Sequence, residues 1–219
     1  MPTLYFNFFS QPSRAIWAFC HATGIEFKEK SIDLAKGEHK GEEYLKVHPH
    51  GQVPAWQEDD GSVYIESSSI LRFLANKYHK TEFWPEDLIE RQQADAGLDF
   101  NGTTVRPGIA TALFGIVIGP KFFGTPEPSE EKKAELLKQQ QDTLDKIEKW
   151  LEGKEFIGGH KLTLPDFQVF NELASAVMMQ GLDLSSHKNI SAWWGRCLEN
   201  ASIRETHEKL GSMLAAMAG

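Results

Sequence analysis

The sequence is poor in cysteine: only Cys20 and Cys197 occur among its 219 residues. So few cysteines argue against a disulfide framework and fit a reducing compartment, so we expect a cytoplasmic protein. Long apolar runs are also missing, because the longest candidate, residues 109–118, is interrupted by Thr111 and Gly115. The N-terminus has no basic lead of the kind that a secretory signal needs. The sequence therefore predicts neither a membrane span nor a secreted protein.

Positive charge is scarce as well. The chain has 23 Lys and Arg against 31 Asp and Glu, a formal net charge of -8 at pH 7. Because a nucleic-acid backbone requires a basic face, we expect no nucleic-acid partner, and an anionic small ligand would need a local basic cluster. What is present is ordinary for a soluble globular protein, with 41% hydrophobic and 25% charged residues. This length suits one large domain or two modest ones.

The beginning of the chain alternates between strand and helix patterns. Residues 3–8 are β-branched and aromatic, which predicts a buried strand. The apolar positions of residues 15–22 suit a helix, and Gly24 follows it where a left-handed backbone is wanted. Residues 27–32 alternate apolar and charged side chains, which predicts a second strand. A strand–helix–strand order with one short crossover favours a parallel pair.

The next stretch centres on Val53 and Pro54. A polar loop at residues 33–41 and a short helix precede them, and an Asp-Gly turn at residues 59–61 and a short strand at 63–65 follow. Since proline cannot donate to a strand ladder, Pro54 marks an edge, a bend or a cis bond, or it merely opens a strand. A kinked edge can offer the Val53 N–H and C=O to an extended peptide ligand.

The rest of the chain is predicted to be helical. A helical period begins at Ser67, and we place a domain boundary at residues 80–87. A long helix after it is interrupted at Pro107-Gly108 and ended by Gly119-Pro120. In all, we expect helices at residues 88–118, 129–152, 189–199 and 202–217, and one that begins near Thr163.

Two of these helices have recognisable internal patterns. Helix 129–152 is amphipathic, with Leu137, Leu144, Ile147 and Leu151 on its apolar face. The helix near Thr163 begins with a capping-box pattern, in which the Thr163 hydroxyl and the Asp166 carboxylate each bond a backbone N–H at the helix start.

A small four-stranded α/β domain followed by a helical one, with Val53-Pro54 at a strand and Glu66-Ser67 opening the next helix, resembles the cytosolic glutathione transferases. The Ser10-Gln-Pro-Ser-Arg-Ala turn, the Asp33-Leu-Ala-Lys-Gly-Glu-His-Lys loop and the Glu66-Ser-Ser-Ser-Ile-Leu helix start are most similar to the theta class. The resemblance implies a thioredoxin-like domain at residues 1–79, a linker at 80–87 and an all-α domain at 88–219. It also implies a homodimer with glutathione as co-substrate, without a further cofactor or metal.

The same resemblance suggests how glutathione would be held. It implies that Val53 pairs with the cysteinyl backbone beside a cis Pro54. The Glu66 carboxylate can meet the glutathione ammonium, while the Ser67 hydroxyl and the N–H groups opening its helix suit a carboxylate.

The other end of glutathione is assigned to the polar loops. His39 and Lys40 match theta positions that hold the glycyl carboxylate, and Gln52 can hydrogen-bond from the rim. Gln52 departs from the theta pattern, where Lys is frequent, and His48 stands where Asn before Pro is frequent. The chain ends at Gly219 without the C-terminal extension of larger theta proteins, so we expect a more open second-substrate pocket.

Ser10 is the candidate catalytic residue. A free thiol has a pKa of about 8.5, so a transferase must stabilise the thiolate, and a hydroxyl that donates to the sulfur does so by roughly 1.5–3 kcal/mol. Ser13 is the alternative, ranked second because it falls inside the first helical turn. Arg14 is expected to be structural and to tie the two domains together.

Three residues are assigned to the second-substrate pocket. Arg106 matches an active-site Arg of some theta members, although a structural role for it is an equal alternative. Met213 and Met217 suit an adaptable apolar roof, and plain core packing is the alternative. Asp99 is a candidate replacement for an Asp that reaches into the partner subunit in some theta members, where this chain has Thr103.

The sequence therefore predicts a serine-type glutathione transferase that attacks hydrophobic electrophiles in detoxification. A glutathione-dependent dehalogenase uses the same thiolate and is the nearest alternative. A non-catalytic binding or assembly module of the same fold is the alternative from another class. A thiol–disulfide oxidoreductase is disfavoured, because the first turn contains Ser10 and Ser13 and no cysteine.

Overall fold

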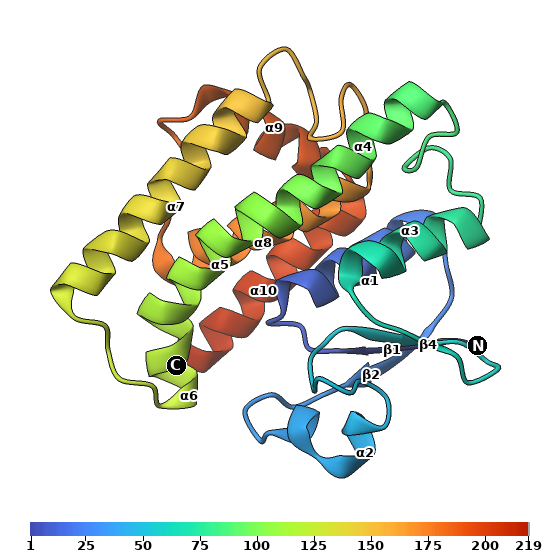
Figure 1. The fold of residues 1–219 in the computed structure, drawn as a ribbon, viewed down its shortest axis with the longest axis horizontal. Coiled ribbons are helices and arrows are strands. Elements are labelled where there is room, and N and C mark those ends of the chain that lie inside the picture. The colour runs from blue at the N-terminus through green and yellow to red at the C-terminus, as the bar shows by residue number, and fades with distance from the viewer. Residues whose placement is uncertain (219) are drawn as a thin grey trace.

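The computed structural model describes residues 1–218. Its first part contains β1 (Thr3–Phe6), α1 (Gln11–Thr23), β2 (Lys28–Ser31), a 3-10 turn (Glu38–Lys40), α2 (Glu42–Leu45), β3 (Ala55–Gln57), β4 (Val63–Tyr64) and α3 (Ser67–Lys77). The strands form one sheet in the order β2-β1-β3-β4, with β1 parallel to β2 and the other pairs antiparallel. Helices α1 and α3 lie on one face of the sheet and α2 on the other (Figure 1). This arrangement confirms the thioredoxin-like domain and the predicted parallel pair.

The alternation of side chains along β1 separates two hydrophobic clusters. Leu4 and Phe6 belong to the large core beneath α1. Tyr5 points to the opposite face, where its ring lies 5.9 Å from that of Tyr44 in α2. Successive side chains of a strand point to opposite faces, so one short strand holds α1 and α2 on opposite sides of the sheet.

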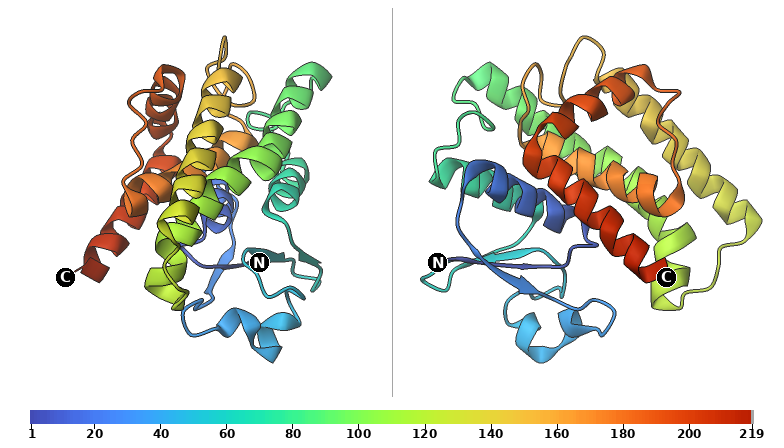
Figure 2. Two further views of the ribbon diagram at one scale, coloured as in Figure 1. Left: turned by 60° about the vertical axis from the view of Figure 1, so that its left-hand side comes forward. Right: turned by 180° about the vertical axis from the view of Figure 1, so that it is seen from behind.

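The second part is helical, which confirms the predicted all-α domain. It contains α4 (Leu88–Phe100), α5 (Arg106–Leu113), α6 (Gly119–Phe123), α7 (Glu130–Trp150), α8 (Leu164–Gln180), α9 (Lys188–Glu199) and α10 (Ala201–Ala218). Helix α8 is its centre, because every residue from Leu164 to Ala176 is buried. It packs against α1, α4 and α5, while α10 runs along the outer side of α1 (Figure 2).

The connector between α3 and α4 is only partly exposed. Trp84 and Pro85 are buried within it, and the Trp84 ring is covered by the Arg91 guanidinium at 5.0 Å. An aromatic side chain of this size is stabilised by burial, so the connector is packed down at this point although its other residues are mostly exposed.

The prediction that Gly119-Pro120 ends the first long helix is wrong. The helix continues to Phe123 and ends at Gly124, whose φ is 64°. Two wider π-helical segments, Asn101–Val105 and Phe114–Ile118, precede α5 and α6. A proline in an α-helix removes one hydrogen bond and its ring crowds the preceding turn, and a π segment directly before it supplies the necessary change of spacing.

This continuous helical run, Leu88–Phe123, is long and apolar enough to cross a membrane by length and composition alone. Core helices pass the same test. Its middle part, α5, packs against α7 and α8 and buries Ile109 and Leu113. We therefore assign the run to the body of the helical domain.

At the start of α7 the buried leucine is Leu136, one residue before the predicted Leu137. Leu137 is 41% exposed, whereas Leu136 is buried together with Leu144, Ile147 and Leu151. At about 100° per residue, Leu136 lies within about 20° of Ile147 around the helix axis, whereas Leu137 lies about 80° from Ile147, at the edge of the buried face. Two adjacent leucines at a helix start leave this choice open in the sequence.

The capping box at the start of α8 is confirmed, and it does more than cap. Asp166 accepts the Thr163 N–H at 2.8 Å, the Ile157 N–H at 2.7 Å and the Trp193 indole N–H at 2.8 Å. Complete burial raises the pKa of this carboxyl to about 6, although its hydrogen bonds act in the opposite direction. One side chain thus joins the α7–α8 loop, α8 and α9.

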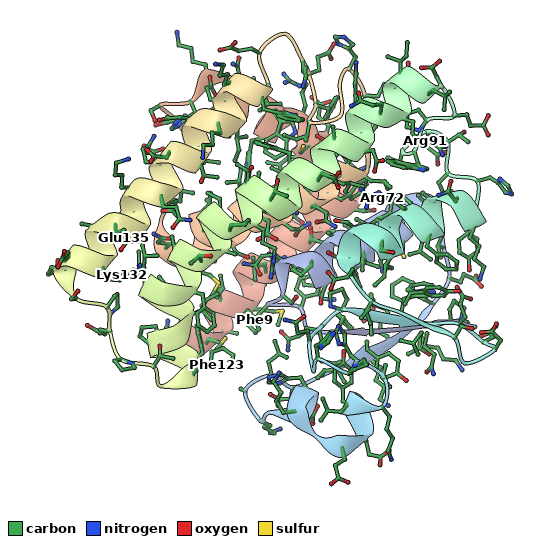
Figure 3. All side chains as sticks on the ribbon, viewed as in Figure 1. Phe9, Arg72, Arg91, Phe123, Lys132 and Glu135 are labelled. Carbon is green, nitrogen blue, oxygen red and sulfur yellow. The ribbon has the colours of Figure 1, made fainter. Side chains whose placement is uncertain are left out.

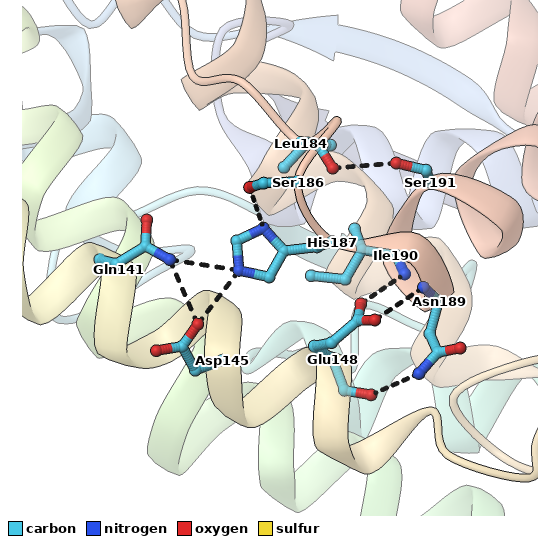
Figure 4. A network of polar contacts seen from close by, with 9 residues as sticks. All are labelled: Gln141, Asp145, Glu148, Leu184, Ser186, His187, Asn189, Ile190 and Ser191. Carbon is cyan, nitrogen blue, oxygen red and sulfur yellow. Dashed lines mark hydrogen bonds and ion pairs between the residues drawn. The ribbon is translucent and has the colours of Figure 1, made fainter.

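A second polar network fixes the α8–α9 loop on α7 (Figure 4). His187 Nε2 lies 3.1 Å from Asp145 Oδ1, and its Nδ1 lies 3.1 Å from the Ser186 hydroxyl. Glu148 accepts the backbone N–H groups of Asn189 and Ile190, both at 2.9 Å, at the start of α9. These residues lie outside the cavity described below, and their bonds to helix ends indicate a structural role.

Candidate functional site

A cavity of about 960 Å³ lies between the two domains. The first domain contributes the turn before α1, the loop that includes the 3-10 turn, residues 51–54 and the start of α3. The second contributes the π segments, α6, α8 and the end of α10. Its polar and charged lining consists of Asn7, Ser10, Gln11, Asp33, His39, Lys40, His48, Gln52, Glu66, Ser67, Ser68, Asn101, Arg106 and Gln168.

The start of α3 brings backbone N–H groups without a side-chain cap to this cavity. Glu66 precedes the helix with φ of 67°, uncommon for a residue other than glycine, and its side chain makes no capping bond. The first N–H groups of α3 therefore have no side-chain cap, and they point toward the N-terminal end of the helix. An acidic side chain next to free N–H groups suits a zwitterion, with the ammonium at Glu66 and the carboxylate at Ser67.

Val53 and Pro54 also line the cavity, and the peptide bond between them is cis. The strand predicted to begin here begins at Ala55 instead. Within residues 1–218 neither the Val53 N–H nor its C=O is bonded to another backbone group. A free N–H and C=O next to a sheet strand are the groups that an extended peptide pairs with.

The residues His39 and Lys40 of the 3-10 turn also line the cavity. His39 Nδ1 is buried and has no partner among the described residues. Burial lowers the pKa of His39, and the neighbouring Lys40 lowers it further. Lys40 Nζ donates to the His50 carbonyl at 3.1 Å. Gly51, with φ of 57°, allows the two loops to meet, because a Cβ there would collide with the His39 carbonyl.

His48, which the sequence pattern marked only as unusual, also lines the cavity. Its side chain is 2% exposed, and its Nδ1 accepts the His50 N–H at 3.3 Å. Burial is the main cause that lowers the pKa of His48, and His50 adds to it. With Nδ1 as acceptor, the proton of the neutral ring is on Nε2.

The structure distinguishes Ser10 from Ser13 by their access to the cavity. Ser10 lines the cavity at the start of α1, and its hydroxyl makes no capping bond. Ser13 is fully buried and does not line the cavity. Its hydroxyl oxygen accepts the Asn7 N–H at 3.5 Å. Of the two hydroxyls, the one of Ser10 is accessible to a ligand.

Arg14 has the structural position that was expected. Its guanidinium is fully buried and donates to the Phe8 carbonyl at 2.8 Å, the Asn171 side chain at 2.9 Å and the Ser175 hydroxyl at 2.6 Å. Burial lowers the pKa of Arg14 to about 10, which the nearby Glu172 carboxylate partly counteracts. The side chain joins α1 to α8 across the domain boundary.

Arg106 lines the cavity from the start of α5. Its Nη1 lies 2.5 Å from Oε1 of Glu172, a carboxylate that is 2% exposed on its side chain, whereas the Arg106 side chain is 44% exposed. The buried acid holds one side of the guanidinium and leaves the rest free for an anionic group in the cavity.

The two predicted methionines have different positions. Met217 lines the cavity, whereas Met213 is not part of its lining and packs against the hydrophobic core. Most of the apolar wall comes from residues that the sequence reasoning did not select: Phe9, Phe114, Ile118, Phe122, Phe123 and Met179. Figure 3 labels Phe9 and Phe123, which bring apolar surface to the cavity from the two domains.

Ser68, Asn101 and Gln168 are among the polar lining residues that the sequence did not single out. Ser68 belongs to a run of three serines after Glu66, of which only Ser67 was selected. Gln168 is 3% exposed in an otherwise apolar stretch of α8, and a polar residue within a buried helix is the signal that points to such a partner. Asp99, the candidate cross-dimer residue, accepts a bond from Arg72 of its own chain at 3.1 Å.

Comparison with known proteins agrees with this architecture. The glutathione S-transferase N-terminal domain family matches residues 9–77, and the glutathione S-transferase C-terminal domain family matches residues 105–201. Human glutathione S-transferase theta-1 is 35% identical over 211 residues, which cover 94% of this chain and 87% of that protein. The chain belongs to the glutathione S-transferase family and is theta-like.

Solved structures give the same result. The apo form of human glutathione S-transferase T1-1 has a TM-score of 0.89 at 30% identity, covering 96% of this chain and 90% of that one. A human theta-class transferase in complex with the glutathione conjugate of 1-menaphthyl sulfate also has a TM-score of 0.89, at 29% identity, covering 99% and 90%.

Proposed function

We propose that the protein conjugates glutathione to hydrophobic electrophiles and that Ser10 activates the glutathione thiol. The observation that carries the proposal is the cavity itself. It brings the free Ser10 hydroxyl, the start of α3 and the unpaired Val53 backbone together with an apolar wall from the helical domain. The human theta-class relative in complex with a glutathione conjugate supports the proposal, because a protein of the same fold binds such a product.

In the proposed binding mode glutathione lies extended along the first domain. Its ammonium meets Glu66, its γ-glutamyl carboxylate meets Ser67 and the α3 N–H groups, and its cysteinyl backbone pairs with Val53 beside Pro54. The glycyl carboxylate then reaches the charged Lys40 and the His39 ring, with Gln52 at the rim.

Ser10 would act on the sulfur. Lowering the thiol pKa by about two units from 8.5 requires about 2.7 kcal/mol of thiolate stabilisation. A hydroxyl that donates to a charged acceptor contributes roughly 1.5–3 kcal/mol, and the start of α1 adds about 0.3–1 kcal/mol. Together these cover the requirement without a general base.

The second substrate would bind against the apolar wall that includes Met217. The thiolate sulfur attacks its electrophilic carbon, forming a C–S bond while the leaving group departs with the electron pair of its bond. Arg106, half exposed and held by Glu172, is placed to receive a negatively charged leaving group. We further propose that the enzyme acts as a cytoplasmic homodimer.

The direct test is retention on immobilised glutathione, followed by turnover measurements with aryl halides, alkyl halides, epoxides and peroxides. Retention with turnover of any of these supports a transferase, and turnover limited to alkyl halides with halide release indicates a dehalogenase. Retention without turnover of the whole panel would favour a binding module instead.

A further inference from the structure

One polar side chain of the helical domain is bonded directly to the start of α3. Gln168, in α8, donates from Nε2 to the hydroxyls of Ser67 and Ser68, each at 3.2 Å. Its Oε1 accepts from Asn101 Nδ2 at 2.7 Å. The amide nitrogen has two hydrogens, so each serine receives one, while Asn101 occupies the oxygen.

These bonds determine where the serine hydrogens point. A hydroxyl that accepts from Gln168 must direct its own hydrogen elsewhere, and within residues 1–218 neither the Ser67 nor the Ser68 hydroxyl donates to an acceptor. Both serines line the cavity, where the uncapped N–H groups of α3 also lie. The two hydroxyls and the N–H groups therefore form a set of donors without acceptors, which suits a carboxylate.

Gln168 itself is held firmly. Its side chain is 3% exposed, and Asn101, at the first position of the π segment, is 1% exposed. Asn101 also lines the cavity, and its Oδ1 is buried without a partner among the described residues.

We infer that Gln168 is a positioning residue that orients the Ser67 and Ser68 hydroxyls toward the γ-glutamyl carboxylate of glutathione. The inference rests on the proposed function for the identity of the ligand. It gives the helical domain a role in binding the peptide, in addition to forming the apolar wall. Removing the amide leaves both hydroxyls free to rotate, and the carboxylate then loses pre-oriented donors.

The test compares two ligands by calorimetry: glutathione and 4-aminobutyryl-cysteinylglycine, which has the amine but no γ-glutamyl carboxylate. Gln168→Met should weaken glutathione binding by about two- to tenfold and change binding of the analogue by less than about twofold. Turnover at saturating glutathione should stay near that of the wild type, because the sulfur end is not affected.

A second variant, Gln168→Glu, reverses the direction in which the Ser67 and Ser68 hydroxyls donate. The carboxylate of Gln168→Glu still accepts from Asn101, but it can only accept from the serines, so their hydrogens turn away from the ligand. The ratio of glutathione affinity to analogue affinity should therefore fall further than in Gln168→Met. The matched control is Gln140→Met, since Gln140 is 2% exposed and exchanges bonds with Gln180 outside the cavity.

The outcomes separate the alternatives. A selective loss for glutathione in both Gln168 variants, with both affinities unchanged in Gln140→Met, supports the inference. Equal weakening of both ligands, or no weakening, overturns it and leaves the proposed function standing if the wild type binds glutathione. Failure of the wild type to bind glutathione would overturn the proposed function, and the inference with it.

Discussion

Ser10 and Ser13 are one helical turn apart, yet only the Ser10 hydroxyl lines the cavity. Ser10→Ala should reduce turnover near pH 6.5–7 by roughly ten- to a hundredfold, the equivalent of about 1.5–3 kcal/mol. Much of the loss should be recovered above a pH of about 8.5, where bulk base supplies the thiolate. Glutathione affinity should stay near normal at a pH where the bound thiol is protonated.

The measurement is the ultraviolet absorbance of the bound thiolate against pH, in the wild type and both serine variants. Ser13→Ala is the control and should change the titration far less, because that hydroxyl is buried and faces Asn7. An unchanged titration in Ser10→Ala, or a larger shift in Ser13→Ala, would falsify the assignment.

The residues at the start of α3 should affect binding more than chemistry. Glu66→Ala or Ser67→Ala removes a bond to a charged group of glutathione, which is expected to weaken its affinity about ten- to a hundredfold. Neither side chain touches the sulfur in the proposed binding mode, so saturating glutathione should restore turnover. Initial rates across a glutathione titration measure this, and a variant that stays slow at saturation would contradict the assignment.

The sequence could single out the candidate residues near the start of α3 because they are close together along the chain. Glu66 and Ser67 open one helix, and Val53-Pro54 forms one turn, so short patterns identify them. Gln168 reaches the start of α3 from 101 residues away, and its contact with Ser67 exists only in the folded chain. Local patterns contain no information about such a partner beyond the presence of a polar residue in a buried helix.

At the scale of an element, α7 offers a test with adjacent residues. Leu136 is buried and lies close to Gly115 of the neighbouring π segment, whereas Leu137 is 41% exposed. Leu136→Ala should lower the free energy of unfolding by about 2–5 kcal/mol, because it removes packed methyl groups and leaves a cavity. Leu137→Ala should change it by less than about 0.5 kcal/mol.

Urea unfolding of both variants measures the difference. A larger loss in Leu137→Ala than in Leu136→Ala would mean that α7 presents its other side to the core. The sequence predicted the helix and most of its apolar face correctly because the 3.6-residue period is strong over its whole length. It did not decide between two neighbouring leucines, since one residue of shift changes the period little at a helix end.

For the whole molecule, the two domains are joined by charged side chains at different depths. Arg14 is fully buried between α1 and α8, whereas Arg72 of α3 pairs with Asp95 at 2.6 Å on α4, where both partners are partly exposed. Arg14→Met leaves several buried acceptors unpaired and should lower the free energy of unfolding by about 3–5 kcal/mol.

Arg72→Met is the matched control, because it also removes a guanidinium that links the domains. Exposed ion pairs are screened by water and contribute about 0–1 kcal/mol, so little change is expected. Urea unfolding followed by fluorescence compares the two variants. Similar small losses in both would show that the Arg14 bonds are not needed to hold the domains together.

The two π segments have a consequence for how this family member can vary. A single residue inserted into an α-helix rotates everything beyond it by about 100°, but a π turn accommodates one extra residue locally. Asn101–Val105 and Phe114–Ile118 each hold such an extra residue while Ile109 and Leu113 between them stay buried. Both segments contribute to the cavity wall, so the gain or loss of one residue in a π turn changes the wall without rotating the helix beyond it.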